Sequence, residues 1–223
     1  MSWFEFVQNV PCSAPLAFRI GIIGAGRVGG ALARALSSHL AWIVARSPWR
    51  RAELRQFLQQ TPIVGSLDEI AVAADVIIIS VPDRAISAIA GELARCFSDQ
   101  LEGKVLVHLS GALTATELAA AAAFGALAIS AHPFTMVPTS DPAWLYGAMW
   151  GIEGNPRAFP FIEAIVHAVG GTPYVLGPTD AKRKALYHAA AVLASNVTTE
   201  VVALAQEVAR LAGIPPERFL PPI

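Results

Sequence analysis

Apolar runs and amphipathic stretches alternate along the chain from residue 19 onward. Residues 20–23 form a short apolar run, and residues 27–38, rich in alanine and leucine, follow it with helical spacing. Residues 76–80 (Val-Ile-Ile-Ile-Ser) have the apolar character of a strand buried on both faces. This alternation predicts a doubly wound α/β fold of the Rossmann type, a parallel sheet with helices on both faces.

The same pattern divides the chain into three regions. Ser66 with Glu69 and Thr114 with Glu117 have the spacing of capping boxes at helix starts. From 179 to 212 one long helical pattern runs without proline or glycine. We expect an N-terminal extension over 1–17, a nucleotide-binding domain over 18–178 and a short helical region over 179–223. Further strands are expected at 41–45, 62–64, 105–109, 126–131, 149–153 and 174–176, and helices at 50–60, after 66, and at 84–97, 114–123 and 157–169.

Composition excludes several classes of protein. The chain is 54% hydrophobic, but glycine and prolines interrupt its longest charge-free stretch, residues 118–140, so we expect no membrane span. The net charge of −1 gives no basic field for nucleic acid. Cys12 and Cys96 lie far apart without a Cys-x-x-Cys pair, which predicts no disulfide framework and no metal site. With no signal peptide, these features favour a soluble protein of the reducing cytoplasm.

A glycine-rich loop, Gly24-Ala25-Gly26-Arg27-Val28-Gly29, follows the first expected strand and opens the first expected helix. In that setting the pattern indicates a dinucleotide site. Gly24 would allow the tight turn, Gly26 would let the backbone approach a pyrophosphate, and Gly29 would let helix and strand pack closely. The free N–H groups of the helix N-terminus favour phosphate. The alternative is a glycine-rich turn without a ligand.

The end of the second expected strand favours NADP(H). NAD-binding chains usually place an acidic residue there, whereas this chain has Arg46 and Ser47 and no carboxylate until Glu53. A guanidinium beside a hydroxyl suits a 2′-phosphate, because it forms charge-assisted bonds to phosphate. Arg50 or Arg51 would add charge from the next helix, and the other of the two would lie in solvent.

Three later strand ends are expected at the same crevice, because ligands of parallel sheets bind at the carboxyl ends of strands. The first is Ser80-Val81-Pro82, expected to border the ribose and nicotinamide. The second is Ser110-Gly111, expected to approach the ring or substrate through backbone groups. The third carries His132, which either exchanges a proton or bonds a loop carbonyl. Ordinary turn chemistry is the alternative at each end, and His108, within a strand, is expected to be a satisfied core residue.

The long helical pattern carries a polar stripe. Lys184 and His188 are four residues apart, Ser195 and Thr199 return to nearly the same direction, and Asn196 lies at its edge. If the stripe faces the crevice, Lys184 could protonate or stabilise an oxyanion, and His188 or Asn196 could hold a polar group of the substrate. The alternative is that residues 182–184 are a solvated basic run.

The combined motifs resemble a known family. They are Gly-Ala-Gly-Arg-Val-Gly at 24–29, Ala-Arg-Ser at 45–47, Ser-Val-Pro-Asp at 80–83, His-Leu-Ser-Gly-Ala-Leu at 108–113, His-Pro-Phe at 132–134 and Lys-Ala-Leu-Tyr-His at 184–188. The chain resembles Rossmann-like proteins whose C-terminal half is a domain of unknown function, within the 6-phosphogluconate dehydrogenase-like superfamily. The resemblance covers nearly all residues from 18 and implies a nicotinamide-binding domain followed by a helical domain that often forms a dimer.

The resemblance also has departures. In the β-hydroxyacid dehydrogenases of that superfamily a helix lysine is catalytic, with an asparagine one turn later. Lys184 matches this lysine, but His188 stands in place of the asparagine. Prephenate dehydrogenases also carry a His-Pro after a late strand, so His132 does not select a branch. Such proteins continue for several more helices, which implies a reduced or truncated helical region here and a substrate pocket that is either incomplete or completed by a partner chain.

Two functions remain open at this stage. The first is an NADP(H)-dependent oxidoreductase that transfers hydride to or from a small carbonyl or imine compound, with Lys184 and either His188 or His132 managing the proton. The second is a non-catalytic NADP(H)-binding regulatory or assembly protein. A deazaflavin in place of the organic substrate is a third possibility. In each case we expect a homodimer through the apolar C-terminal helix.

Overall fold

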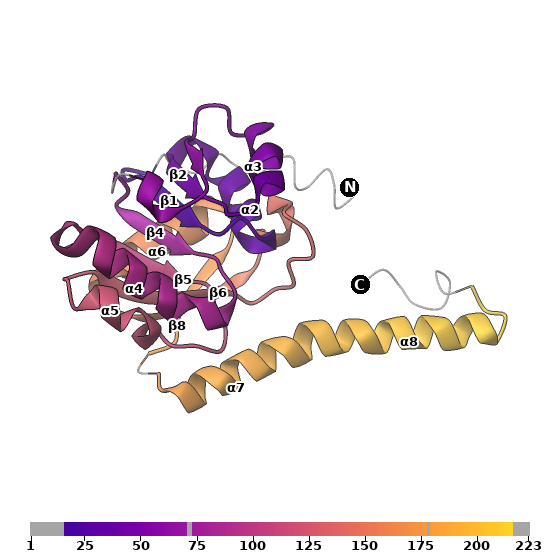
Figure 1. Cartoon of the computed structure of the whole chain (residues 1–223). Helices are drawn as coiled ribbons and strands as arrows, with labels where there is room; N and C mark the ends of the chain where they lie inside the picture. Colours follow the sequence, from indigo (N-terminus) through magenta and orange to yellow (C-terminus); the bar gives the residue numbers. More distant parts are fainter. Residues whose placement is uncertain (1–15, 71–72, 178, 216–223) are drawn as a thin grey trace.

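The computed structural model describes residues 16–70, 73–177 and 179–215. Its centre is an eight-stranded sheet in the order β3-β2-β1-β4-β5-β6-β7-β8 (Figure 1). Its first six strands, β3-β2-β1-β4-β5-β6, have the order of a Rossmann sheet. The strands are β1 (Ile20–Ile23), β2 (Leu40–Val44), β3 (Ile63–Val64), β4 (Val76–Ile79), β5 (Val105–His108), β6 (Leu127–Pro133), β7 (Met149–Gly154) and β8 (Thr172–Val175).

The expectation of a wholly parallel sheet is wrong at the last two strands. β1 to β6 pair in parallel, but β7 runs antiparallel to β6, and β8 is parallel to β7. The physical reason lies in the connections. A parallel pair needs a long crossover, usually a helix. The connection between β6 and β7, residues 134–148, has no α-helix and contains only the 3₁₀ turn η6 (Pro142–Leu145), whereas α6 (Phe159–Ala168) crosses from β7 to β8.

Helices cover both faces of the sheet, as expected for a doubly wound fold. One core cluster joins the strands to α2 (Arg27–Ala35), α3 (Pro48–Arg55) and α6. A second cluster joins the opposite face to α4 (Ile86–Phe97) and α5 (Ala119–Ala122). β1 and β4 are buried along their whole length, which explains why the sequence shows them as continuous apolar runs.

Several helices are shorter than the sequence pattern indicates. The helix expected after Ser66 is only the 3₁₀ turn η2 (Leu67–Glu69), although its capping box with Glu69 is present. The second capping box is wrong: Glu117 accepts a bond from Ser87, and the Thr114 hydroxyl bonds Thr116. There, the 3₁₀ turn η5 (Ala115–Leu118) precedes α5.

The C-terminal region is one long helix that leaves the body of the molecule (Figure 1). It comprises α7 (Ala181–Val192), a π-helical turn, η8 (Leu193–Val197), and α8 (Thr198–Leu211). Within the described part of the chain, Ala181–Leu211 is the helix long and apolar enough to cross a membrane, judged by length and composition only. Its apolar side chains lie largely exposed.

Candidate active site

The glycine loop has the three features that a dinucleotide loop requires. Gly24 has a φ of +99°, and a Cβ there would collide with the backbone carbonyl of Ser80. A Cβ at Gly29 would meet the carbonyl of Gly24 and the Ser80 side chain, so helix α2 packs directly on the strand ends. At Gly26 nothing lies within 4 Å of where a Cβ would be. The loop is therefore tight at its ends and open at its middle.

The N-terminus of α2 is free to receive an anion. Gly26 is its N-cap and offers no side-chain bond, and no acidic residue lies in the first turn of this nine-residue helix. The first N–H groups of a helix lack intrahelical partners and carry a partial positive charge. The loop and the helix together provide the geometry of a phosphate site.

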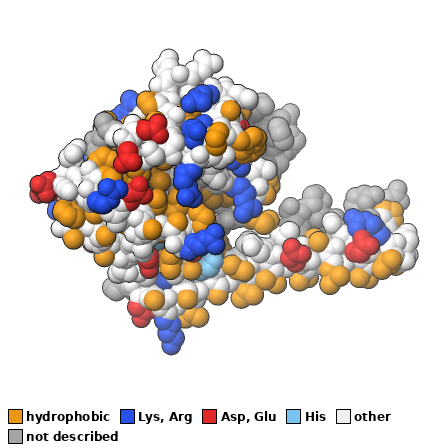
Figure 2. Space-filling view, in the orientation of Figure 1, with side chains coloured by type: hydrophobic (Ala, Val, Ile, Leu, Met, Phe, Trp, Pro, Cys, Tyr) orange, Lys and Arg blue, Asp and Glu red, His pale blue; other side chains and the backbone are white. Residues whose placement is uncertain are grey.

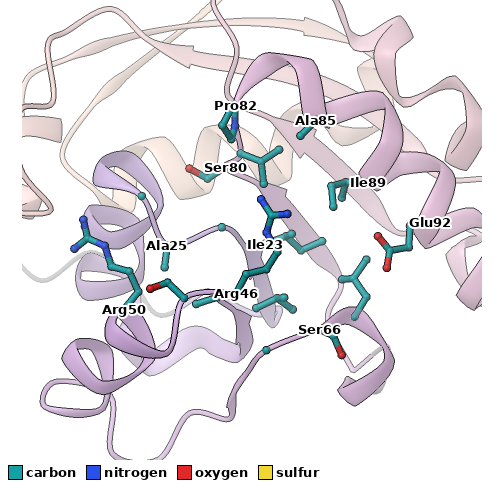
Figure 3. A pocket seen from close by; sticks show the side chains of 18 of the residues that line it. Ile23, Ala25, Arg46, Arg50, Ser66, Ser80, Pro82, Ala85, Ile89 and Glu92 are labelled. Carbon is teal, nitrogen blue, oxygen red and sulfur yellow. The ribbon is translucent and has the colours of Figure 1, made fainter.

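A cleft of about 570 Å³ opens at these strand ends (Figure 3). A volume of this size is typical of cofactor and small-molecule sites. Its lining includes nine of the residues singled out from the sequence: Gly24, Ala25, Gly26, Arg46, Ser47, Arg50, Ser80, Val81 and Pro82. Their placement at the cleft is confirmed, and their binding roles stay predictions. Arg27 and Val28 line a different cleft.

We call this cleft the nucleotide cleft, and its remaining wall was not predicted from the sequence as part of a site. This wall is formed by residues of and just before η2 and α4: Gly65, Ser66, Leu67, Ala85, Ala88, Ile89 and Glu92. Figure 3 labels Ser66, Ala85, Ile89 and Glu92. The apolar members suit the faces of an adenine ring. The sequence marks Ser66 only as a helix cap, and an apolar residue of a helix that faces a cleft has the same pattern as one that faces the core.

Three arginines lie at or near the nucleotide cleft, and their contacts differ. Arg46 is exposed and points into the cleft (Figure 3). Arg50 bonds Glu53 at 2.6 Å and lies over the ring of Trp49. Arg51, expected in solvent if Arg50 serves the site, instead donates to the carbonyls of Ala45 and Arg46 at 2.8 Å. Arg51 therefore holds the end of β2 in place, and Arg46 is the arginine available to a ligand.

A second cleft of about 290 Å³ lies between the sheet and the long helix. It brings together the candidate residues His132, His188 and Asn196 with Arg27 and Val28 of the glycine loop. The polar stripe expected on the helix does face the crevice at these positions. The remaining lining is mostly apolar: Leu109, Pro133, Thr135, Met136, Val137, Ala191, Val192 and Ser195.

His132 is held by Tyr187. The Tyr187 hydroxyl donates to the backbone oxygen of His132 at 3.2 Å and lies 3.3 Å from its Nδ1. When the hydroxyl proton lies toward the backbone oxygen, Nδ1 of His132 is the donor to the tyrosine oxygen and its Nε2 is an acceptor. Burial, with His188 and Lys184 nearby, lowers the pKa of His132 to about 3. His132 is thus a neutral group of fixed orientation, unsuited to act as an acid near pH 7.

His188 packs edge-on against His132, with ring centroids 5.4 Å apart. Its Nδ1 is buried and has no hydrogen-bond partner among the described residues. An unsatisfied buried nitrogen costs about 1–3 kcal/mol, so such a group in a native structure marks a functional candidate. A Cβ at Gly111 would lie 2.9 Å from Nε2 of His132 and closer still to Nδ1 of His188. The two histidines and Gly111 therefore form one contact at the wall of the second cleft.

Lys184 lies one layer below this histidine pair and lines neither cleft. Its side chain is fully buried, and Nζ donates to the hydroxyl of Ser130 at 2.8 Å. Four residues of helix rise about 6 Å and two residues of strand about 6.6 Å, so Lys184 and His188 match Ser130 and His132 along α7 and β6. Burial lowers the pKa of Lys184 to about 8, opposed by the charge of Glu153. This burial contradicts the solvated alternative for Lys184, and the expected contact of Lys184 with the substrate stays a prediction.

The Ser110 side chain also has a structural place. Its hydroxyl donates to Asp83 at 2.9 Å and accepts from the backbone N–H groups of Ala112 and Leu113. Ser110 lines neither cleft, and its carbonyl accepts from Ser130. The expected approach of the Ser110-Gly111 backbone to the ring or substrate stays a prediction. His108 is the satisfied core residue expected, since Nε2 bonds the Thr114 carbonyl and Nδ1 accepts from the Ser110 N–H.

Family comparisons agree with this architecture. Residues 11–133 match the family model of the Rossmann-like domain, and residues 148–223 match that of DUF2520, a domain of unknown function. No curated protein matches the chain.

Similar solved structures include reductases and a reductive aminase. Pyrroline-5-carboxylate reductase from Coxiella burnetii is 17% identical, with a TM-score of 0.69 over 91% of this chain and 74% of that chain. Imine reductase from Pseudomonas sp. is 20% identical, with a TM-score of 0.69 over 91% and 69%. Reductive aminase from Aspergillus terreus, in complex with NADPH and ethyl levulinate, is 22% identical, with a TM-score of 0.65 over 92% and 70%. At these identities the likeness shows the fold.

Proposed function

We propose that this chain, which belongs to the Rossmann-like domain family and continues into DUF2520, is an NADP(H)-dependent oxidoreductase for a small carbonyl or imine compound. The observation that carries the proposal is the adjacency of two clefts at one glycine loop. Gly24 to Gly26 line the nucleotide cleft, and the next residues, Arg27 and Val28, line the second cleft. A cofactor on one side of the loop would therefore border a substrate on the other.

The nucleotide cleft fits a dinucleotide phosphate. The open Cβ direction at Gly26 and the uncapped start of α2 suit the pyrophosphate. Arg46 and Ser47 lie at the start of α3, which has no side-chain cap and no acidic residue in its first turn. This second positive helix end supports binding of a 2′-phosphate rather than a ribose hydroxyl.

Bound NADPH would supply a hydride. The chain's own residues would bind and orient the acceptor in the second cleft. His188 and Asn196 face that cleft from the long helix and would hold the polar atom on which charge develops. We assign Lys184 a positioning role, because its bond to Ser130 fixes α7 on β6 and thereby sets where His188 stands.

Titration calorimetry with NADPH and NADH tests the proposal. Wild-type protein is expected to bind NADPH more tightly than NADH by about tenfold or more, since a charge-assisted phosphate contact contributes about 1.5–3 kcal/mol. Arg46→Ala should remove that preference and leave NADH binding unchanged. Arg95→Ala, which removes an exposed arginine of α4 outside both clefts, is the matched control. Absence of binding by either nucleotide would overturn the assignment.

The long helix supports a proposal about assembly. Val197, Val201, Leu204, Val208 and Leu211 are exposed at spacings of 4, 3, 4 and 3 residues, which is a heptad pattern. Figure 2 shows this apolar edge along the free helix. We propose that a second copy of the chain covers it, because an identical helix presents a self-complementary stripe.

We also propose the cytoplasm as the compartment, where Cys96 stays a free thiol.

A further inference from the structure

The second cleft has a one-sided charge. Arg27 is the single lysine, arginine, aspartate or glutamate that lines it among the residues the structure describes. Its side chain is exposed, and no ion pair joins it to a carboxylate in the described part of the chain. Arg27 is also the first residue of α2, so the positive end of that helix adds to the same field.

The histidine wall of the second cleft also carries positive charge nearby. Lys184 lies beneath His132 and contributes, with burial and His188, to the low pKa of the His132 imidazole. Burial, the largest cause, disfavours any charge, whereas the smaller Coulombic contributions of His188 and Lys184 would act against a cation placed beside the imidazole. A protonated imine would meet Arg27 and this wall with no carboxylate among the described residues that line the cleft.

The second cleft also offers hydrogen bonds among apolar groups. The Ser195 hydroxyl donates to the Ala191 carbonyl at 2.7 Å and lies 3.0 Å from the Asn196 side-chain oxygen, and the Asn196 amide brings N–H donors to the cleft. Met136, Val137 and Val192 line the same cleft. The volume of about 290 Å³ limits the occupant to a small molecule.

We propose that the second cleft binds a small carbonyl compound that carries a carboxylate, a 2-oxo acid in its simplest form, with the carboxylate on Arg27 and the carbonyl toward His188 and Asn196. Identifying this cleft with the substrate site rests on the proposed function. The inference narrows that function, since it selects an anionic carbonyl compound over an imine.

Equilibrium binding of matched probes tests this inference without turnover. The probes are 2-oxobutanoate, its methyl ester and the cyclic imine 2-methyl-1-pyrroline, added to the protein with and without saturating NADP⁺. Binding is followed by nuclear magnetic resonance through the imidazole Cε1–H signals of His132 and His188, assigned from single His→Gln variants. We expect 2-oxobutanoate to bind about tenfold or more tightly than its ester, with shifts confined to these two histidines. Arg27→Gln should abolish the difference, Arg27→Lys should keep part of it, and Arg157→Gln, an exposed arginine outside both clefts, should keep all of it.

Each other outcome counts against the inference. Equal binding of acid and ester, tighter binding of the imine, or no binding of 2-oxobutanoate in either state overturns it. So does an Arg27→Gln variant that weakens NADP⁺ alone, because Arg27 would then serve the pyrophosphate. The proposed function fails on a separate measurement, the absence of nucleotide binding, while the acid preference can still be read on the nucleotide-free protein.

Discussion

Gly111 lies directly against His188: a Cβ at this glycine would fall closer to the imidazole than side chains allow. Its φ is not in the left-handed region, so the glycine is required here by space. The contact ties the loop after β5 to the long helix, and it places His188 beside His132. The positions of His188 and His132 in the second cleft thus depend on the lack of a side chain at Gly111.

Gly111→Ala is therefore expected to destabilise the protein and to displace both histidines. Overpacking of this kind costs about 1–3 kcal/mol. Urea unfolding would measure the loss, and the imidazole resonances would show the displacement. Gly91→Ala is the control, because nothing lies within 4 Å of the Cβ position and the site is inside α4. That control should gain stability by about 0.5–1 kcal/mol. An unperturbed Gly111→Ala variant would contradict the packing.

Buried Lys184 should make stability rise with alkaline pH. Its pKa falls from 10.5 to about 8 in the folded chain. Between these values the unfolded chain holds a proton that the native chain has lost, so the free energy of unfolding increases with pH. The full effect is on the order of 3 kcal/mol.

Comparison with Lys184→Met tests this. The wild type should gain stability relative to that variant as pH rises from about 8 to 10.5, by denaturant unfolding at each pH. Lys182→Met, on an exposed lysine of the same helix, should follow the wild type. A parallel pH dependence for wild type and Lys184→Met would mean that the ammonium is hydrated in solution.

His132 predicts a loss of stability on the acid side. Its pKa is about 3 in the folded chain against 6.5 ordinarily. As pH falls from 6.5 toward 3, the unfolded chain binds a proton that the native chain excludes, so the free energy of unfolding decreases. His132→Gln should be less sensitive to acid over this range, measured by thermal unfolding. The exposed His167→Gln control should not. Equal sensitivity of the two variants would show that His132 takes up its proton while folded.

The local motifs could be predicted from the sequence because each one depends on near neighbours. Gly24 and Gly26 follow an apolar strand and open a helix, and Arg46 lies at the next strand end; all three line the nucleotide cleft. The roles of Ser110 and Lys184 depend on distant partners. Asp83 takes the Ser110 hydroxyl, and Ser130, 54 residues from Lys184, takes its ammonium.

The direction of β7 and the residues that complete the nucleotide cleft also depend on contacts between distant parts of the chain. The apolar pattern of β7 identifies a strand but does not indicate its direction, and β7 runs antiparallel after a connection that has no crossover helix. Leu67 and Glu92 complete the nucleotide cleft from η2 and α4, and their patterns are those of any helical turn. Sequence periodicity identifies the apolar and polar faces of each helix and strand, but it does not show which faces pack against one another, and a binding site depends on that packing.

The exposed stripe of α8 predicts a dimer that one substitution can dissociate. Leu204 is 66% exposed at the middle of the stripe, so in an isologous interface it would be buried in both copies. Burial of a leucine contributes about 1.5–3 kcal/mol, and Leu204→Glu would also place two like charges together. We expect the dimer dissociation constant to rise by more than about a hundredfold, measured by sedimentation equilibrium. Glu207→Gln, on an exposed polar residue of the same helix, should leave it unchanged. A monomeric wild type, or one that binds lipid vesicles through this helix, would contradict the second copy as its occupant.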